Sequence, residues 1–170
     1  MASKRPPGLA ATLEEIQSRL ARLEAAARAP AAVAADPAKF WLVDRIAQGG
    51  ARGGEVAYGG TATLPSGEQF AWQRQVAAKD LLRHEWEGLD RVLAALGHPV
   101  RLRLLRAIVH GRRTKADLEQ LEGLGTTGQL YHHLKTLEAA GWVRVLERGT
   151  YGVPGERVIP LLAILAAAAG

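Results

Sequence analysis

The chain has 170 residues, an apolar fraction of 48% and a net charge of +5. This length allows one full domain, or a small domain with an appendage, and the basic excess favours polyanionic partners only slightly. Because the chain has no cysteine, disulfides and thiolate metal sites are excluded. We find no secretory signal, and no apolar run approaches the roughly 20 residues of a membrane span. We therefore expect a cytoplasmic protein without membrane contact.

Residues 1–37 predict an amphipathic helix followed by a linker. The apolar residues follow the alternating spacing of three and four that places them on one side of a helix, namely Leu13, Ile16, Leu20, Leu23 and Ala27. Thr12 and Glu15 have the spacing of a capping box, which predicts a helix start at Thr12. The apolar residues form a seam along the helix. Three interpretations are open: a contact between subunits, packing on the chain's own domain, or a loose arm. Ala29–Pro37 has the composition of a linker.

Residues 38–78 predict a short helix ending near Gly49 and then a β-hairpin that serves dimerisation or ligand sensing. The strands are expected on both sides of the turn sequence Leu64–Glu68, with Gly59-Gly60 interrupting the first of them. Two strands alone are marginal in water, so the hairpin must pack on a helix or on another subunit. Its aromatic residues either form a small core or line a ligand pocket; they are Tyr58, Phe70 and Trp72.

Residues 79–170 predict four helices and a second hairpin. The first helix carries an apolar stripe from Trp86 to Leu96, the second begins at Pro99, and the others begin at Thr114 and Thr126, each with capping-box spacing. Two short strands follow Gly141. This order is that of a winged helix-turn-helix, in an α+β chain that is mostly α, with an N-terminal helix and a β-hairpin appended. We expect subunit contacts at Leu13–Ala27 and at the apolar tail Ile159–Ala169.

The fourth helix of this region predicts a DNA-binding face. With Leu130, Leu134 and Leu137 turned inward, polar side chains face outward, and no carboxylate occurs between Thr126 and Leu137. Amide, phenol, imidazole and ammonium groups suit base edges and phosphates. The predicted contacts are Thr126, Thr127, Gln129, Tyr131, His132, Lys135 and Thr136 on the helix, Arg148 at the hairpin tip, and Arg112 and Arg113 before the third helix. Any one of these arginines could instead be a solvated surface charge.

Two segments resemble ArsR-type winged-helix transcriptional regulators. LGHPVRLRLL at 96–105 is similar to the opening of that family, and QLYHHLKTLEAAGWV at 129–143 is similar to its recognition helix and the strand that follows. The resemblance covers Trp86–Val153 and implies a homodimer on a palindromic operator, often with repression relieved by a ligand. The family's metal sensors carry a cysteine pair where this chain has Asp117–Leu121. Tyr131 replaces a usually small hydroxyl residue, so the family's base preference does not carry over.

The remaining motifs predict neither a metal nor a catalytic site. Adjacent residues on a helix point about 100° apart, so His132 and His133 do not chelate one ion, and His133 is expected to be a satisfied, partly buried residue. No nucleophile elbow, phosphate-binding loop or HExxH motif occurs, and we expect no cofactor and no enzyme. The predicted function is a sequence-specific transcriptional regulator, in particular a repressor, open to a small-molecule effector. The alternative is a winged helix that pairs with protein without specific DNA binding.

Overall fold

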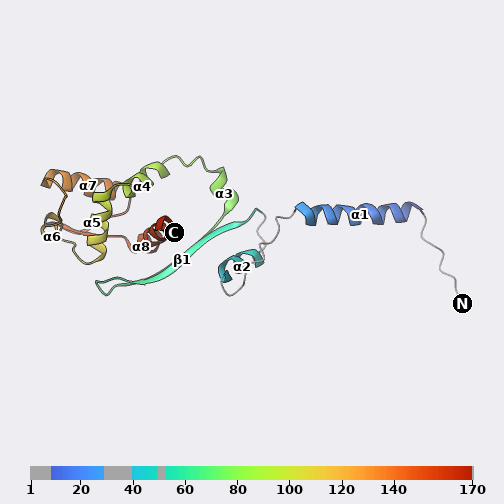
Figure 1. Ribbon diagram of the computed structural model, residues 1–170, viewed down its shortest axis with the longest axis horizontal. Coiled ribbons are helices and arrows are strands. Elements are labelled where there is room, and N and C mark those ends of the chain that lie inside the picture. Colours follow the sequence, from blue (N-terminus) through green and yellow to red (C-terminus); the bar gives the residue numbers. More distant parts are fainter. Residues whose placement is uncertain (1–8, 29–39, 50–52, 170) are drawn as a thin grey trace. The chain divides into compact units, whose positions relative to one another are not determined.

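The computed structural model describes residues 9–28, 40–49 and 53–169 and divides the chain into two units, Met1–Asp44 and Arg45–Gly170. It is an α+β structure, mostly helical, with two small antiparallel hairpins (Figure 1). In chain order the elements are α1 (Leu9–Arg28), α2 (Trp41–Gln48), β1 (Glu55–Thr63), β2 (Gln69–Ala77), α3 (Ala78–Arg83), α4 (Leu89–Leu96), α5 (Pro99–Val109), α6 (Lys115–Glu119), α7 (Thr127–Ala139), β3 (Arg144–Glu147), β4 (Thr150–Gly152) and α8 (Gly155–Ala169). The predicted division at residues 37 and 78 stays a prediction. No helix in these described ranges is long and apolar enough to cross a membrane.

The helix α1 confirms the expected element but not its start. It begins at Leu9, so Thr12 lies inside the helix and the predicted cap at that residue was wrong. The seam residues Leu13, Ile16 and Leu20 are all more than half exposed. Their role in a dimer stays a prediction, and the expected linker, Ala29–Pro37, lies outside the described residues.

The first hairpin is longer and more regular than its sequence indicates. The antiparallel register runs from Glu55 opposite Ala77 to Thr63 opposite Gln69. Strand β1 passes through Gly59 and Gly60 without interruption, because strand pairing holds these two glycines in extended conformation. The predicted break at that point was wrong. The turn closes through the backbone amide of Leu64, which donates to the carbonyl of Glu68 over 2.8 Å.

The C-terminal helix α8 covers part of this hairpin and contacts both of its strands. Glycines permit the close approach. A methyl group added at Gly60 would lie 3.8 Å from Cγ2 of Ile159, and one added at Gly155 would lie 3.3 Å from the ring of Phe70. The first half of α8 is therefore buried within the chain itself, whereas the exposed Leu162 and Leu165 remain open to the predicted subunit contact.

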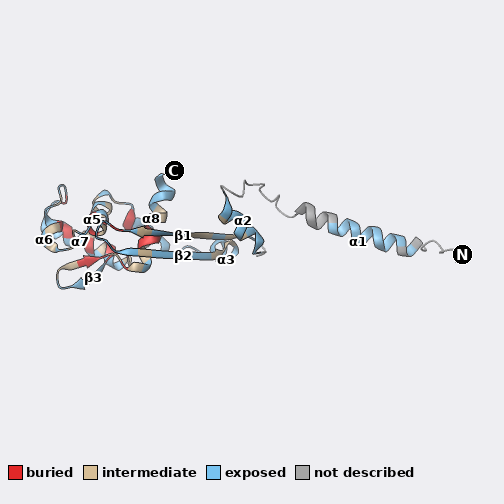
Figure 2. Ribbon diagram, turned by 90° about the horizontal axis from the view of Figure 1, so that it is seen from below, coloured by how far each residue is buried: buried red, intermediate tan, exposed pale blue. Residues whose placement is uncertain are grey.

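The hydrophobic core lies almost wholly in the part of the chain that follows the first hairpin, in its helices, the turn before α7 and the second hairpin (Figure 2). Among the described residues only Leu64 contributes a buried hydrophobic side chain from before α4. The expected stripe of α4 is mostly exposed, since Trp86, Leu89 and Leu93 are 61%, 46% and 56% accessible, and Leu96 is the one member that is buried. Trp86 precedes the helix with a φ of 49° and donates its indole N–H to the carbonyl of Leu81.

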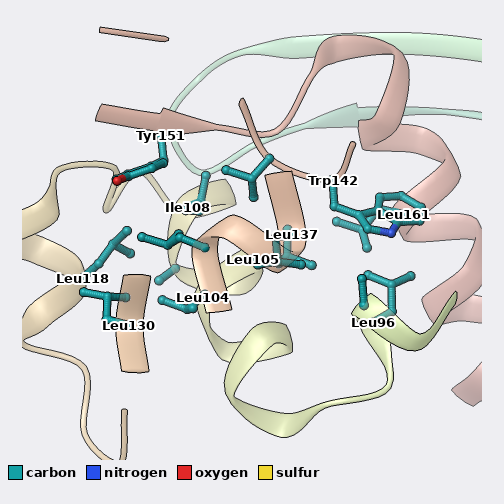
Figure 3. Packing of buried hydrophobic residues seen from close by; sticks show 14 of the residues in the cluster. Leu96, Leu104, Leu105, Ile108, Leu118, Leu130, Leu137, Trp142, Tyr151 and Leu161 are labelled. Atoms are coloured by element: carbon teal, nitrogen blue, oxygen red, sulfur yellow. The ribbon is translucent and has the colours of Figure 1, made fainter. Parts of the chain in front are cut away.

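Leucines from α5, α6 and α7 meet in the centre of this core (Figure 3). Leu104, Leu118 and Leu137 have no exposed surface. Trp142 lies farther along the cluster, beside Leu161 (Figure 3), and donates its indole N–H to the carbonyl of Val92 over 2.9 Å, which satisfies the one polar atom that this side chain brings into the core. Burial of several large side chains between three short helices fixes how those helices cross.

The second hairpin, β3–β4, is short and is bonded to the connection between α5 and α6. Its register contains an irregularity between Val145 and Glu147. The amide of Tyr151 donates to the carbonyl of Arg113, and the amide of Lys115 donates to the carbonyl of Gly149, both over 2.9 Å. The Tyr151 side chain is buried, and burial raises the pKa of its phenol. The hairpin is thus attached to the start of α6 by backbone hydrogen bonds.

Candidate nucleic-acid interface

The helices α6 and α7 are joined by a tight turn, and their first residues cap them as the sequence predicts. Gly123 and Gly125 in the turn have φ values of +71° and +78°, a conformation that favours glycine. Thr114 and Thr126 each cap the following helix through a complete capping box. Leu124, buried between the two glycines, holds the turn against the core. The orientation of α7 is therefore set at its first turn and along its leucine face.

The outer surface of α7 is polar and free of carboxylates up to Glu138. Thr127, Gln129, His132 and Lys135 are all exposed, as the helical spacing predicts. Their exposure makes them available to a partner, and uncharged or cationic groups on one helix face favour a polyanion over a neutral surface. Their roles as DNA contacts stay predictions.

Two of the predicted contacts are partly engaged within α7. The side-chain oxygen of Gln129 accepts from the amide of Thr126 over 2.8 Å, which leaves its amide N–H groups as the free donors. The hydroxyl of Thr136 donates to the carbonyl of His132 over 2.9 Å. The capping box therefore uses one lone pair of the Gln129 oxygen, while the second lone pair and the amide N–H groups have no partner within the described residues.

Tyr131 lies on the flank of α7 that faces α6. The ammonium of Lys115 is 5.3 Å from the centre of its ring. A hydrogen bond with Tyr131 and the nearby carboxylate of Glu119 raise the pKa of Lys115. Lys115 therefore stays cationic near neutral pH and lies beside the polar face of the recognition-type helix.

His133 lies on the other flank of α7, beside the N-terminus of α5. Its ring centre is 4.8 Å from that of His98, whose Nδ1 accepts the amide of Val100 and so caps α5. Burial, followed by the charges that His98 and Arg101 would place nearby, lowers the pKa of His133. Its buried Nδ1 has no hydrogen-bond partner, so the expectation of a satisfied histidine was wrong. The neighbouring His98 already uses its Nδ1 to cap α5, so that atom does not pair with His133.

The predicted arginine contacts separate into three environments. Arg148 is exposed in the turn between β3 and β4, where it is open to a partner. Arg113 forms an ion pair with Glu68 in the first hairpin. Arg112 donates to the carbonyl of Asp117 over 2.7 Å and lies next to Arg103. The link between Arg113 and Glu68 could not be foreseen, since 45 residues separate them and each also fits a surface role.

The aromatic residues of the first hairpin share one face of its sheet. In the register, Tyr58 is opposite Arg74 and Trp72 is opposite Gly60, so both aromatic side chains point to the same side as Phe70. Phe70 packs against α8 and is half-buried, whereas Trp72 is 42% exposed. Phe70 thus has a structural role, and a ligand role for the three together stays a prediction.

A scan against protein-family models finds no match to this chain, and a search of the curated proteins finds none. The described residues also contain no group of three or more His, Asp or Glu side chains arranged to hold a metal ion. The surface of α7, its neighbours and the charge that they carry are therefore the features that bear on function.

Proposed function

We propose that residues 86–153 form a winged helix-turn-helix and that the protein is a sequence-specific, DNA-binding transcriptional regulator. The observation that carries this proposal is the exposed, carboxylate-free surface of α7, presented by a capped helix that follows α6 through a tight turn. In this proposal α7 enters the major groove, and His132 and Lys135 reach base edges and phosphates. Arg148, in the β3–β4 turn, contacts the backbone or the minor groove beside it.

The regulator acts as a homodimer on a palindromic operator in this proposal. The exposed seam of α1 and the exposed leucines Leu162 and Leu165 of α8 support it, since apolar surface of this kind is commonly covered by a partner. A two-fold dimer would present its two α7 helices to successive major grooves about 34–36 Å apart. Selection from random DNA is therefore expected to return an inverted repeat whose half-sites are about 10 base pairs apart.

Two substitutions on α7 test the assignment of the interface. Lys135→Ala removes a phosphate contact, so it is expected to weaken binding to all sequences and to reduce the salt slope by about 1. His132→Ala is expected to relax base preference at one position of each half-site by about 1–3 kcal/mol. Binding is measured by fluorescence anisotropy over a salt series, with the selected operator and scrambled DNA.

Lys79→Ala serves as the control, because it removes the same charge from an exposed position on α3. It is expected to leave both affinity and base preference unchanged. If a protein with both α7 substitutions binds the operator as tightly as the unmodified chain at matched salt, α7 is not the recognition helix. Affinity without any sequence preference would instead favour a winged helix that pairs with protein.

A further inference from the structure

A cleft of about 580 Å³ lies beside α5, between it and the segments 110–112 and 120–122 that flank α6, and Arg112 is its one lining residue with a predicted DNA contact. This volume falls within the range of small-molecule sites. The cleft is lined by three arginines, Arg103, Arg106 and Arg112, and by one carboxylate, that of Glu122. The excess of guanidinium groups in one concave surface is the feature that needs an explanation.

Two of these guanidinium groups are held in place by uncharged acceptors. Arg103 donates to the backbone carbonyls of Glu122 and Gly123 over 3.1 and 3.2 Å, and Arg112 donates to the carbonyl of Asp117 over 2.7 Å. A guanidinium has five N–H donors, so both keep donors for a further partner. A carbonyl carries no formal charge, and although the carboxylate of Asp117 is near enough for its charge to interact with that of Arg112, neither guanidinium forms an ion pair in the described residues.

Glu122 is the one acid in the lining, and two other acids near the cleft are engaged with different residues. The carboxylate of Asp117 accepts the hydroxyl of Thr114, and this capping interaction lowers the pKa of Asp117. Glu119 is paired with Lys115 over 3.5 Å. Over the described ranges, none of the three cleft arginines forms an ion pair. The cleft therefore has positioned cationic donors and a net positive charge.

We propose that this cleft binds a small organic molecule with two or more phosphate or carboxylate groups. Planar guanidinium groups bind such oxygens through paired, charge-assisted hydrogen bonds. The apolar lining residues Ala107 and Leu121 provide a surface for the carbon skeleton of the ligand. Concavity favours a small molecule over DNA, whose backbone would contact the arginines only from outside the cleft.

The ligand also regulates DNA binding in this proposal, a step that rests on the proposed function. Arg103 holds the two carbonyls of the turn that precedes Thr126 and α7. An anion that draws this guanidinium into the cleft removes two hydrogen bonds from the turn and changes the position of α7. Ligand and DNA would then weaken each other's binding by the same factor.

Titration of the full chain with pyrophosphate and with citrate tests the site. At about 0.15 M salt, where long-range charge effects are screened, NMR shifts are expected to concentrate in the second half of α5 and in residues 110–112 and 120–122. The side chain of Arg106 is exposed and donates no hydrogen bond within the described residues, so Arg106→Gln should spare the fold, and it is expected to weaken probe binding about tenfold. Arg91→Gln makes the same charge change at an exposed position on α4 and should leave probe binding unchanged.

The proposal is overturned if neither probe shifts the resonances of the residues that line the cleft, or if Arg91→Gln weakens probe binding as much as Arg106→Gln. It is also overturned if Arg106→Gln lowers DNA affinity and the salt slope while probe binding stays intact, because the cleft would then contact the DNA backbone. In support, the probe raises the Kd for DNA with the unmodified chain and not with Arg106→Gln at equal ionic strength. Failure of the chain to bind any DNA would reject the proposed function without affecting the probe titration.

Discussion

The two β-hairpins of this protein differ in length, and the shorter one is held more firmly by the rest of the fold. Each strand of β1–β2 has nine residues, whereas β3 and β4 have four and three. Yet in the long hairpin and its turn only Leu64 is buried, while the short hairpin buries Tyr151 and Gly152. The surface that a hairpin covers, rather than the number of its ladder hydrogen bonds, decides how well it is held.

Arg113 is the point where the two hairpins meet. Its backbone carbonyl accepts the amide of Tyr151, and its guanidinium pairs with Glu68 in the turn of the long hairpin. The first bond is buried and belongs to the helical core, whereas the second is a partly exposed ion pair, a weak kind of contact. We therefore expect β3–β4 to unfold with the core and β1–β2 to open at a lower free energy.

The largest expected effect comes from replacing one aromatic residue in each hairpin and comparing the two losses of stability. Tyr151→Ala empties a buried position and is expected to lower the free energy of unfolding by about 3 kcal/mol. Trp72→Ala removes a side chain that is 42% exposed and is expected to cost less than about 1 kcal/mol. Urea unfolding followed by circular dichroism measures both. Equal losses would mean that the long hairpin is as much a part of the core as the short one.

The two turn glycines sharpen the comparison further. Gly67 and Gly149 have φ values of +90° and +78°, and a methyl group added at either would meet no atom within 4 Å. Alanine therefore imposes only the backbone cost, about 1 kcal/mol, or about fivefold in hydrogen-exchange protection. Gly149→Ala should lower the protection of α5 amides but not of β1–β2 amides, because the second turn stays folded when the long hairpin opens. Gly67→Ala should lower both.

Native-state hydrogen exchange at low denaturant measures these protections residue by residue. If Gly149→Ala also lowers the protection of the β1–β2 amides fivefold, both hairpins unfold in one cooperative step. The expected independence of the long hairpin would then be wrong.

The parts of the fold that sequence predicted well depend on neighbours within a few residues. The capping boxes at Thr114 and Thr126 are confirmed, since cap and partner are three residues apart. The cap at Thr12 failed because the same spacing also occurs inside a helix that begins earlier. The stripe containing Leu89 and Leu93 failed because spacing shows which residues share a helix side, not whether another element covers that side.

The parts of the site that sequence did not predict depend on contacts between distant segments. The pairing of Arg113 with Glu68 and the cleft around Arg103 both arise where the chain returns to itself. Composition shows that arginines are abundant but not which of them are neutralised by a carboxylate. The exposure of His132 and Lys135, in contrast, follows from helical periodicity once the leucine face is known.

The smallest expected effect concerns the ion pair between the long hairpin and Arg113. The hydrogen bond from Arg113, and after it that from Ser66, lowers the pKa of Glu68 below its ordinary value of 4.5. A carboxylate whose pKa is lower in the folded state stabilises the fold above its unfolded pKa and loses this contribution as pH falls through its folded pKa. Because the Glu68 side chain is 44% exposed, the contribution is discounted to about 0.5 kcal/mol.

Urea unfolding at pH 7 and pH 3 measures how much free energy of unfolding is lost at acid pH. This loss should be slightly smaller for Glu68→Gln than for the unmodified chain. Glu147→Gln, an exposed residue of β3, should keep the original loss. If Glu68→Gln loses as much stability at acid pH as the unmodified chain, this ion pair does not help to hold the long hairpin.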